Sequence, residues 1–337
     1  MLHLFERDRM HKGGFAVTAN LSSRFAAHLE ELMDIKRNFG FSLKYMDAHI
    51  ASFDVFCRER YPDKNNLDQE LVEAWIYDTN SKSRQELNKR VRTMRHLANH
   101  LTSQGISAYL CPVRFKIPKS PEPHIFTDVQ LSEFFRICDS FDPVPFPRYR
   151  HILLPVMFRM IYCCGLRNSE ACNLRRDDIN FNNGVVMIVG SKGHKDRLVY
   201  LTGDLLELCA KYDAAMEALL PNRDYFFPSH HSKHFSNTTV CDQFDQILTK
   251  TSFYGKTSKK PTCHGFRHTF AVNSMRHCIA RGDDFGIYIQ YLSKYMGHKN
   301  PQETLYYLHM VVNVIPVLRE KASGFEDVIG GVRYVEE

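Results

Sequence analysis

The sequence lacks any long apolar segment. None of its hydrophobic runs approaches the roughly 18 residues that suggest a membrane-spanning helix. The N-terminus, MLHLFERDRMHKGG, places acidic and basic residues where a signal peptide needs a continuous apolar stretch. These two absences argue against membrane and secreted proteins, and we expect a cytoplasmic protein.

The cysteines and histidines lack the spacing of a metal site. The ten cysteines include no C-x-x-C pair, and Cys163 and Cys164 are direct neighbours, which suits neither a zinc site nor a disulfide framework. We therefore expect reduced, mostly packed thiols. The histidines of the segment SHHSKHF (residues 229–235) have no acid or cysteine at ligand spacing, which favours a surface loop. A net charge of +6 permits an acidic partner such as DNA without demanding one.

The chain is long enough for two domains, and most of it reads as helix. Its 337 residues exceed one average domain, and a hydrophobic content of 44% supplies ample material for a core. Between Asn20 and Gly105 the apolar residues recur at helical spacing in four segments. One runs over residues 42–61 and is stopped by Pro62, and another covers residues 81–103.

The helix over residues 81–103 carries basic side chains off its apolar stripe. They are Lys82, Arg84, Lys89, Arg90, Arg92 and Arg95, with Glu86 as the only acid among them. A basic helix face suits DNA binding but is as often a solvated surface, so by itself it decides nothing.

Proline density marks the domain boundary. Residues 111–126 (CPVRFKIPKSPEPHIF) contain four prolines, which exclude helix and favour an extended connector. We therefore expect an N-terminal extension (1–19), a helical domain (20–110), a proline-rich linker (111–126) and a second domain (127–337) that ends in a helix and a short tail. Within the second domain, residues 179–201 read as short strands broken by turns. The predicted fold is thus mainly α with a small antiparallel β-meander.

Two segments of the second domain place a cation at a turn. In GLRNSE, Arg167 opens a helix, where its guanidinium and free backbone N–H groups can face an anion, and Glu170 at i+3 can hold it. In GSKGHKDRLV, Lys192 lies at a hairpin tip between two glycines and is therefore mobile and exposed. Each has an ordinary alternative, a capped helix with an Arg–Glu pair and a solvated turn lysine.

Two further segments supply histidine, arginine and tyrosine. In CHGFRHTF, His264 and Arg267 are i,i+3 neighbours on one helix face and both can donate to a phosphate, whereas we interpret His268 as a structural histidine. In YMGHKNPQETLYYLH, His298 precedes a helix that begins at Asn300-Pro301 and carries two adjacent tyrosines nearly two turns later. Adjacent helical residues point about 100° apart, so only one tyrosine can face what His298 faces.

Together these residues fit phosphoryl transfer without a metal. That reaction needs stabilisation of charge on the equatorial oxygens, an in-line nucleophile and a proton donor for the leaving oxygen. Arginines and histidines can supply the first, a tyrosine the second by forming a phosphotyrosine, and a mobile lysine the third. The sequence offers no carboxylate cluster to hold a metal.

The set resembles the tyrosine recombinases of the phage integrase family. G-L-R-x-S-E, K-G-x-K-x-R-x-V, H-G-x-R-H-T-F, and G-H followed nine residues later by Y-x-H all occur in the family's order. The resemblance covers about residues 165–309, and the preceding helices and linker are similar to the family's core-binding domain. No single motif decides the matter, but all four in order are specific.

The resemblance implies a role for each matching residue. Arg167 and Arg267 would clamp the scissile phosphate, Lys192 would protonate the leaving 5′-oxygen, and Tyr307 would be the nucleophile. His264 and His298 would contact the phosphate, His264 also assisting proton transfer, with Glu170 in support. Expected contacts to DNA are Arg84, Lys89, Arg92, Lys195, Lys256, Lys259 and Lys260.

The family's reaction also implies partners and cofactors. Strand exchange through a 3′-phosphotyrosine keeps the bond energy in the ester, so no ATP, metal or other cofactor is expected. Two domains around duplex DNA, a tetramer in the synapse and possible accessory recombinase proteins are implied. The C-terminal helix (residues 314–318 at its apolar centre) would dock on a neighbouring protomer or on its own domain. We expect no additional arm-binding domain, because only 19 residues precede Asn20.

The biological role has alternatives at this point. The segment over residues 275–291 looks longer than in chromosome resolvases and favours the integrase or transposase of a mobile element. A host chromosome resolvase, a type IB topoisomerase-like enzyme and a catalytically inert DNA-binding accessory protein are the alternatives. The complete set of catalytic residue types argues against the last. The DNA target, the direction of recombination and any accessory factor are not readable from the sequence.

Overall fold

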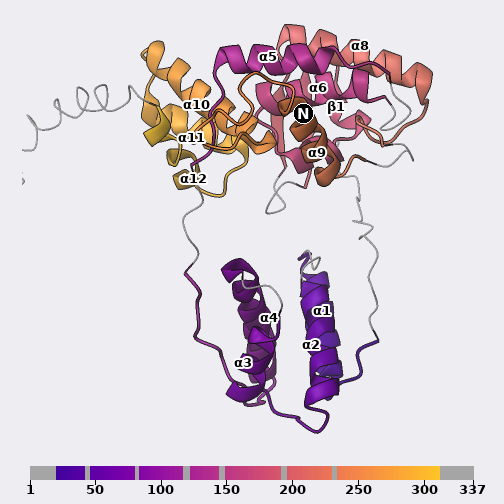
Figure 1. Cartoon of the computed structure of the whole chain (residues 1–337), viewed down its shortest axis with the longest axis vertical. Coiled ribbons are helices and arrows are strands. Elements are labelled where there is room, and N and C mark those ends of the chain that lie inside the picture. The colour runs from indigo at the N-terminus through magenta and orange to yellow at the C-terminus, as the bar shows by residue number, and fades with distance from the viewer. Residues whose placement is uncertain are drawn as a thin grey trace, which may run out of the picture. The chain divides into compact units, whose positions relative to one another are not determined.

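The computed structural model divides the chain into two compact units, Met1–Ser120 and Pro121–Glu337 (Figure 1). It describes residues 20–41, 46–79, 83–116, 122–143, 149–190, 196–229 and 234–311. Lys192 and Lys195, the N-terminal extension and the expected C-terminal helix therefore lie outside the described residues. The division falls inside the predicted proline-rich linker. Cys111 already belongs to the core of the first unit and Phe126 to the core of the second.

The first unit is helical in its described part, as the apolar spacing predicts. Its helices are α1 (Ala26–Asn38), α2 (Met46–Arg60), α3 (Gln69–Tyr77) and α4 (Arg84–Ser103). Their apolar faces meet around Trp75, the only tryptophan of the sequence, which is fully buried and meets Phe53 edge to face at 5.4 Å between ring centroids. Within the described residues, no helix of either unit is both long and apolar enough to cross a bilayer.

Helix α4 uses two of its basic side chains for structure. The Arg90 guanidinium lies 4.6 Å from the Trp75 ring centroid and donates to the carbonyls of Trp75 and Asp78. Arg95 donates to the carbonyl of Cys111 at 2.7 Å and so fixes the chain that leaves the helix. The basic face expected from the sequence is consequently narrower, since Arg84, Lys89 and Arg92 are the exposed members among the described residues.

The second unit combines helices with the small sheet. In chain order its described elements are α5 (Asp128–Asp139), α6 (Arg150–Cys163), α7 (Asn168–Asn173), η1 (Arg176–Asp178), β1 (Ile179–Asn180), β2 (Val185–Ile188), β3 (Arg197–Tyr200), α8 (Gly203–Leu219), α9 (Asn237–Leu248), α10 (Cys263–Ala280), α11 (Phe285–Met296), α12 (Gln302–Leu305) and η2 (Leu308–Met310). The strands pair antiparallel in the order β1-β2-β3, with Val186 opposite Val199. The predicted meander and the mainly helical fold class are thus confirmed.

Helix α10 passes through the core of this unit. Its Phe266 is fully buried, with the rings of Phe126, Phe134 and Phe244 at centroid distances of 5.0, 5.0 and 5.4 Å. The backbone N–H of Phe126 also donates to Thr269 Oγ1 at 3.0 Å, which ties the start of the unit to the helix. This packing fixes the position of the polar residues on either side of Phe266.

The ten cysteines are all free, and all but Cys163 and Cys241 are buried, as expected. The segment after α11 is less helical than predicted. Helix α12 ends at Leu305, so Tyr306 and Tyr307 lie in the turn between α12 and η2 rather than well inside a helix. The backbone N–H of Tyr307 bonds the carbonyl of Thr304, an i,i−3 bond that tightens the turn.

Candidate functional site

Arg167 lies at the start of helix α7 and is held by Glu170. The Glu170 carboxylate accepts from the backbone N–H of Arg167 and from its guanidinium, both at 2.8 Å. The same carboxylate accepts from Arg197 of strand β3 at 2.9 Å. Glu170 is buried and therefore needs this pairing, because a buried carboxylate without a partner is costly. The expected Arg167–Glu170 contact is present, and Arg197 is an additional partner that the sequence did not single out.

The turn that ends helix α11 gathers both arginines. Arg167 donates to the carbonyl of Gly297 at 2.8 Å, and Arg267 donates to the adjacent carbonyl of Met296. The last carbonyls of a helix lack intrahelical partners and carry partial negative charge, so they attract guanidinium groups. Gly297 has φ of +65°, a conformation that glycine adopts without strain.

Arg267 is buried as deeply as a core residue. It is 1% exposed, and its second contact is to the carbonyl of Gly165 on the opposite side. Gly165 has φ of +60°, and a side chain there would meet the ring of Phe270 at 2.5 Å. The Gly-Leu-Arg turn therefore needs glycine both for its conformation and for its close approach to helix α10.

Aromatic rings form a continuous row beside these arginines. The ring centroids of His264 and His268, one turn apart on α10, are 4.6 Å apart, and His268 lies 5.4 Å from Tyr307. His298 stacks on the other side of Tyr307 at 6.4 Å, and its Nδ1 is 2.6 Å from Thr304 Oγ1. The structure thus brings together three histidines and a tyrosine from two separate segments of the sequence.

The two adjacent tyrosines have different surroundings. Tyr307 is 4% exposed, and its hydroxyl lies 2.9 Å from His268 Nδ1. Tyr306 is 43% exposed, and its ring meets the Tyr307 ring edge to face at 5.6 Å between centroids. Asn300 caps the intervening helix, its side chain accepting from the N–H of Glu303 at 3.2 Å. The environment therefore distinguishes the tyrosine that spacing alone selected.

His268 is the residue whose position the sequence interpretation missed. It does have a hydrogen-bond partner, as a structural histidine should, but the partner is the Tyr307 hydroxyl. Its adjacency to Arg267 was readable from the sequence, and its i+4 spacing from His264 placed it on the same helix face. The signal lacking was the long-range contact to a residue on another element.

Desolvation and nearby positive charges keep His264 and His268 neutral. Desolvation and the neighbouring His264 and Arg267 lower the pKa of His268 to about 3. Desolvation, with Arg267 and Arg167 nearby, lowers the pKa of the solvent-touching His264 to about 4. The pKa of Arg267 falls to about 10, chiefly through burial, so this residue stays cationic at neutral pH.

The phenol of Tyr307 is also neutral in this setting. Burial raises its pKa, although the cationic Arg267 opposes that effect. The site therefore holds arginine cations compensated by Glu170, neutral imidazoles and a protonated phenol. Such a set can bind a phosphate monoanion and present an oxygen nucleophile to it.

The basic residues expected to bind DNA lie in both units. In the first unit, Arg84 donates to the carbonyl of Lys116, Lys89 approaches Glu86 at 3.3 Å, and Arg92 is exposed. In the second unit, Lys256 and Lys260 are exposed, whereas Lys259 forms an ion pair with Glu122. Their contact with DNA stays a prediction.

Comparison with known proteins agrees with this fold. A solved structure of the XerH site-specific recombinase bound to difH DNA superimposes with a TM-score of 0.61 at 19% identity, covering 85% of this chain and 82% of that one. A lambda integrase tetramer bound to a Holliday junction superimposes with a TM-score of 0.54 at 15% identity, covering 85% and 81%. The fold is therefore the one seen in tyrosine recombinases.

The family assignment follows from the sequence as well. The model of the phage integrase family matches residues 126–313, which is more than half of the chain. The chain is also 27% identical over 304 residues to the putative integrase/recombinase y4rE of Sinorhizobium fredii, covering 87% of this chain and 94% of that protein. This chain belongs to the phage integrase family, the tyrosine recombinases.

Proposed function

We propose that this protein is a site-specific DNA recombinase that cuts and rejoins DNA through a 3′-phosphotyrosine on Tyr307. The observation that carries the proposal is the convergence of two arginines and three histidines around one buried tyrosine. Family membership supports the reaction class, and the geometry supports the assignment of Tyr307 rather than Tyr306 as nucleophile.

In the proposed reaction, the Tyr307 phenolic oxygen attacks the scissile phosphorus while the bond to the 5′-oxygen breaks. The phenolic proton passes to solvent with the assistance of His264, the residue proposed to help proton transfer, and Lys192 is the proposed donor of the proton that the departing 5′-oxygen gains. The 5′-hydroxyl of another strand then attacks the phosphotyrosine and restores the free tyrosine. One ester replaces another at each step, so neither ATP hydrolysis nor a redox change is needed.

Arg167 and Arg267 are proposed to bind the phosphate in different ways. Arg167 keeps part of its guanidinium at the surface, with its side chain 16% exposed, so DNA can reach it directly. Arg267 is enclosed by carbonyls, and an incoming phosphate reaches it only if the Met296–Gly297 turn moves aside. We therefore propose that DNA binding displaces this turn, exchanging carbonyl acceptors for phosphate oxygens.

His268 is proposed to position the nucleophile. With a pKa of about 3 it is a weak base at neutral pH, because an efficient general base has a pKa near the working pH. Its neutral ring nitrogen instead fixes the Tyr307 hydroxyl by a hydrogen bond. His264 and His298 are proposed to contact the phosphate, with Glu170 orienting Arg167.

The proposed partners are duplex DNA carrying a recombination site and further copies of this chain. A synaptic tetramer is supported by the superposition on the lambda integrase tetramer, although that likeness is one of fold. We propose that the protein works in the cytoplasm, as the integrase or transposase of a mobile element. The longer segment over residues 275–291, which covers the end of α10 and the start of α11, supports that role over a chromosome resolvase. Repeats and neighbouring transposition genes around the reading frame would support it too, and their absence would favour a host resolvase.

The test of the chemistry is covalent trapping on DNA. A suicide substrate with a nick beside the cleavage position loses its 5′-hydroxyl fragment, so a phosphotyrosine adduct accumulates and migrates slowly on a denaturing gel. We expect the adduct with the wild type and with Tyr306→Phe, and none with Tyr307→Phe. An adduct that persists in Tyr307→Phe and disappears in Tyr306→Phe would overturn the assignment.

The same assay separates recombination from topoisomerase activity. Two DNA molecules carrying the cognate site give exchanged products with a recombinase, whereas a type IB topoisomerase only relaxes supercoils. Because the cognate site is unknown, the DNA flanking the gene is the first source of candidate substrates. Absence of an adduct on every flanking sequence, with the active-site residues intact, would favour the inert accessory protein.

A further inference from the structure

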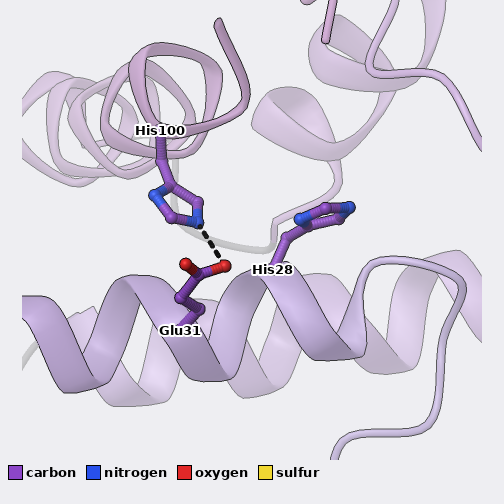
Figure 2. Close-up of side chains that lie close together, drawn as sticks. All are labelled: His28, Glu31 and His100. Atoms are coloured by element: carbon purple, nitrogen blue, oxygen red, sulfur yellow. Dashed lines mark ion pairs between the residues drawn. The ribbon is translucent and has the colours of Figure 1, made fainter. Parts of the chain in front are cut away.

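A cluster of side chains that can ligate a metal joins helices α1 and α4 in the first unit, whereas the described residues of the proposed reaction belong to the second unit. Figure 2 shows His28 and Glu31, one turn apart on α1, facing His100 of α4. One ligand atom from each residue lies within 4.8 Å of the other two. His28 and Glu31 are far from His100 in the sequence, so ligand spacing along the chain gives no sign of the group.

The buried member of the cluster lacks a proper hydrogen bond. His100 has a side chain that is 6% exposed, and its Nε2 has no hydrogen-bond partner among the described residues. It forms an ion pair with Glu31 Oε2 at 3.4 Å, which is long for a charge-assisted hydrogen bond. A buried ring nitrogen that has only this long ion pair is poorly satisfied, so a further bond at Nε2 would be favourable.

The Glu31 carboxylate is already held in one orientation by a hydrogen bond. Gln104, just beyond the end of α4, donates its side-chain amide to Glu31 Oε2 at 2.6 Å. Ligating carboxylates are commonly held by such an outer hydrogen bond. Glu31 is exposed and His28 half-buried, so the cluster opens to solvent on one side while His100 closes it on the other.

We propose that His28, Glu31 and His100 bind a divalent transition-metal ion, with Zn²⁺ the best fit. Two imidazole nitrogens and one carboxylate oxygen suit Zn²⁺ and exclude the all-oxygen preference of Mg²⁺ and Ca²⁺. With Zn–N and Zn–O distances of about 2.0–2.2 Å, tetrahedral ligand atoms lie roughly 3.4 Å apart. The Glu31–His100 separation of 3.4 Å already equals that edge.

The distances from His28 to the other two ligand atoms would shorten to this value through a small movement of the His28 side chain. His28 is the half-buried ligand and can rotate its ring toward the other two, whose positions Gln104 and the core fix. The exposed side leaves the fourth position to water. The metal would then cross-link α1 to α4, the helix that carries the exposed Arg84, Lys89 and Arg92, and would stabilise the unit by mass action.

This site is independent of the proposed recombination chemistry, and its test uses no DNA. The full-length protein, stripped of metal with a chelator, is titrated with Co²⁺ and followed by visible absorption, then with Zn²⁺ and followed by thermal unfolding. We expect one equivalent of Co²⁺ with the intense bands of tetrahedral coordination, displaced by Zn²⁺, and a midpoint of unfolding that rises with Zn²⁺.

Ligand variants decide whether the metal is in this cluster. His28→Gln, which changes a half-buried residue and so spares the core, and Glu31→Gln should weaken binding at least about tenfold and remove the tetrahedral spectrum. His96→Gln, on the same helix but outside the cluster, is the matched control and should bind as the wild type does. A variant lacking His230 and His231 controls for the histidine-rich segment over residues 229–235 and should also bind.

Three results would overturn the proposal. They are a weak octahedral Co²⁺ spectrum, an unchanged unfolding midpoint in Zn²⁺, and wild-type binding by His28→Gln and Glu31→Gln. Loss of binding in the variant without His230 and His231 would assign the metal to those two histidines instead. None of these results bears on formation of the covalent DNA adduct, so the metal-site proposal and the recombinase proposal are tested independently.

Discussion

Tyr307 and His268 form a pair of neutral groups inside a site rich in arginine. The 2.9 Å contact between the Tyr307 hydroxyl and His268 Nδ1 orients the phenolic oxygen. Removing it should allow the tyrosine to rotate and should slow DNA cleavage. One net hydrogen bond contributes about 0.5–1.5 kcal/mol, which corresponds to a roughly two- to twelvefold change in rate.

We therefore expect His268→Leu to reduce the single-turnover rate of adduct formation by about three- to tenfold. His268→Asn, whose Oδ1 takes the place of Nδ1, should stay within about threefold of the wild type. Denaturant unfolding of the three proteins checks that the folded populations are equal. Identical cleavage rates for the Leu and Asn variants would show that the hydrogen bond does not position the nucleophile.

The same histidine makes stability depend on pH. Its pKa is about 3 in the folded protein, whereas an unfolded histidine titrates near 6.5, so the unfolded chain binds more protons between these values. Stability is therefore fully present above pH of about 6.5 and is lost as pH falls toward 3. From pH 6.5 to pH 5 the loss should be about 2 kcal/mol.

Denaturant titrations at pH 7.5 and pH 5 measure that loss. His268→Asn cannot be protonated, so its stability should fall less over the same interval than that of the wild type. Using one protein as the reference for the other removes the contribution of the remaining histidines. Equal losses in both proteins would place the folded pKa of His268 near its ordinary value.

At the scale of elements, the C-terminal turn of α11 organises the site because its carbonyls hold both arginines. A methyl group on Gly297 would lie 3.0 Å from Arg197 and 3.4 Å from Arg167, in addition to the strain of a positive φ. Gly282, in the turn after α10, has a φ of +73° and nothing within 4 Å of such a methyl group. Comparing alanine substitutions at the two glycines therefore distinguishes the effect of backbone strain from the effect of crowding the arginines.

We expect Gly282→Ala to cost about 1–2 kcal/mol of stability and to leave the cleavage rate of the folded protein unchanged. Gly297→Ala should cost roughly 1–3 kcal/mol more and reduce the cleavage rate at least tenfold, because Arg197 and Arg167 must shift. Urea unfolding and single-turnover cleavage give the two quantities. Matching behaviour of the two variants would mean that the turn supplies only a backbone conformation.

The elements themselves were largely predictable, because periodicity and turn residues are local signals. The four N-terminal helices, the meander over residues 179–201 and the cap at Asn300 followed from spacing, proline and glycine. The length of α12 did not, since the turn at Tyr306 and Tyr307 is set by burial of Tyr307 against α10 rather than by helix propensity.

The sequence did not reveal which side chains from distant segments contact one another. Arg197 and Glu170 meet because β3 passes α7, and His268 meets Tyr307 because η2 packs on α10. The helical spacing places Arg90 among the basic side chains off the apolar stripe, but its contact with Trp75 lies in the core. Motif order identified the catalytic candidates only because a family pattern already joined the segments.

At the scale of the whole molecule, exposed basic side chains occur on both units, and their proposed common partner is the DNA backbone. Each phosphate neutralised by a lysine or arginine releases condensed counterions, so the logarithm of the binding constant falls with the logarithm of salt concentration. Side chains that bind phosphate can thus be told from those that only stabilise the fold, even on one helix.

Helix α4 offers such a matched pair in Arg92 and Arg90. Arg92 is exposed, whereas Arg90 is 8% exposed and donates to the carbonyls of Trp75 and Asp78.

Arg92→Ala should keep the unfolding midpoint and reduce the slope of log K against log salt by about 0.9. Arg90→Ala should lower the unfolding midpoint by several degrees, because the carbonyls of Trp75 and Asp78 lose the guanidinium donor and the Trp75 ring loses its cation–π contact. Fluorescence anisotropy on a labelled duplex at four salt concentrations measures the slope. A slope unchanged in Arg92→Ala would remove this face of α4 from the proposed DNA surface.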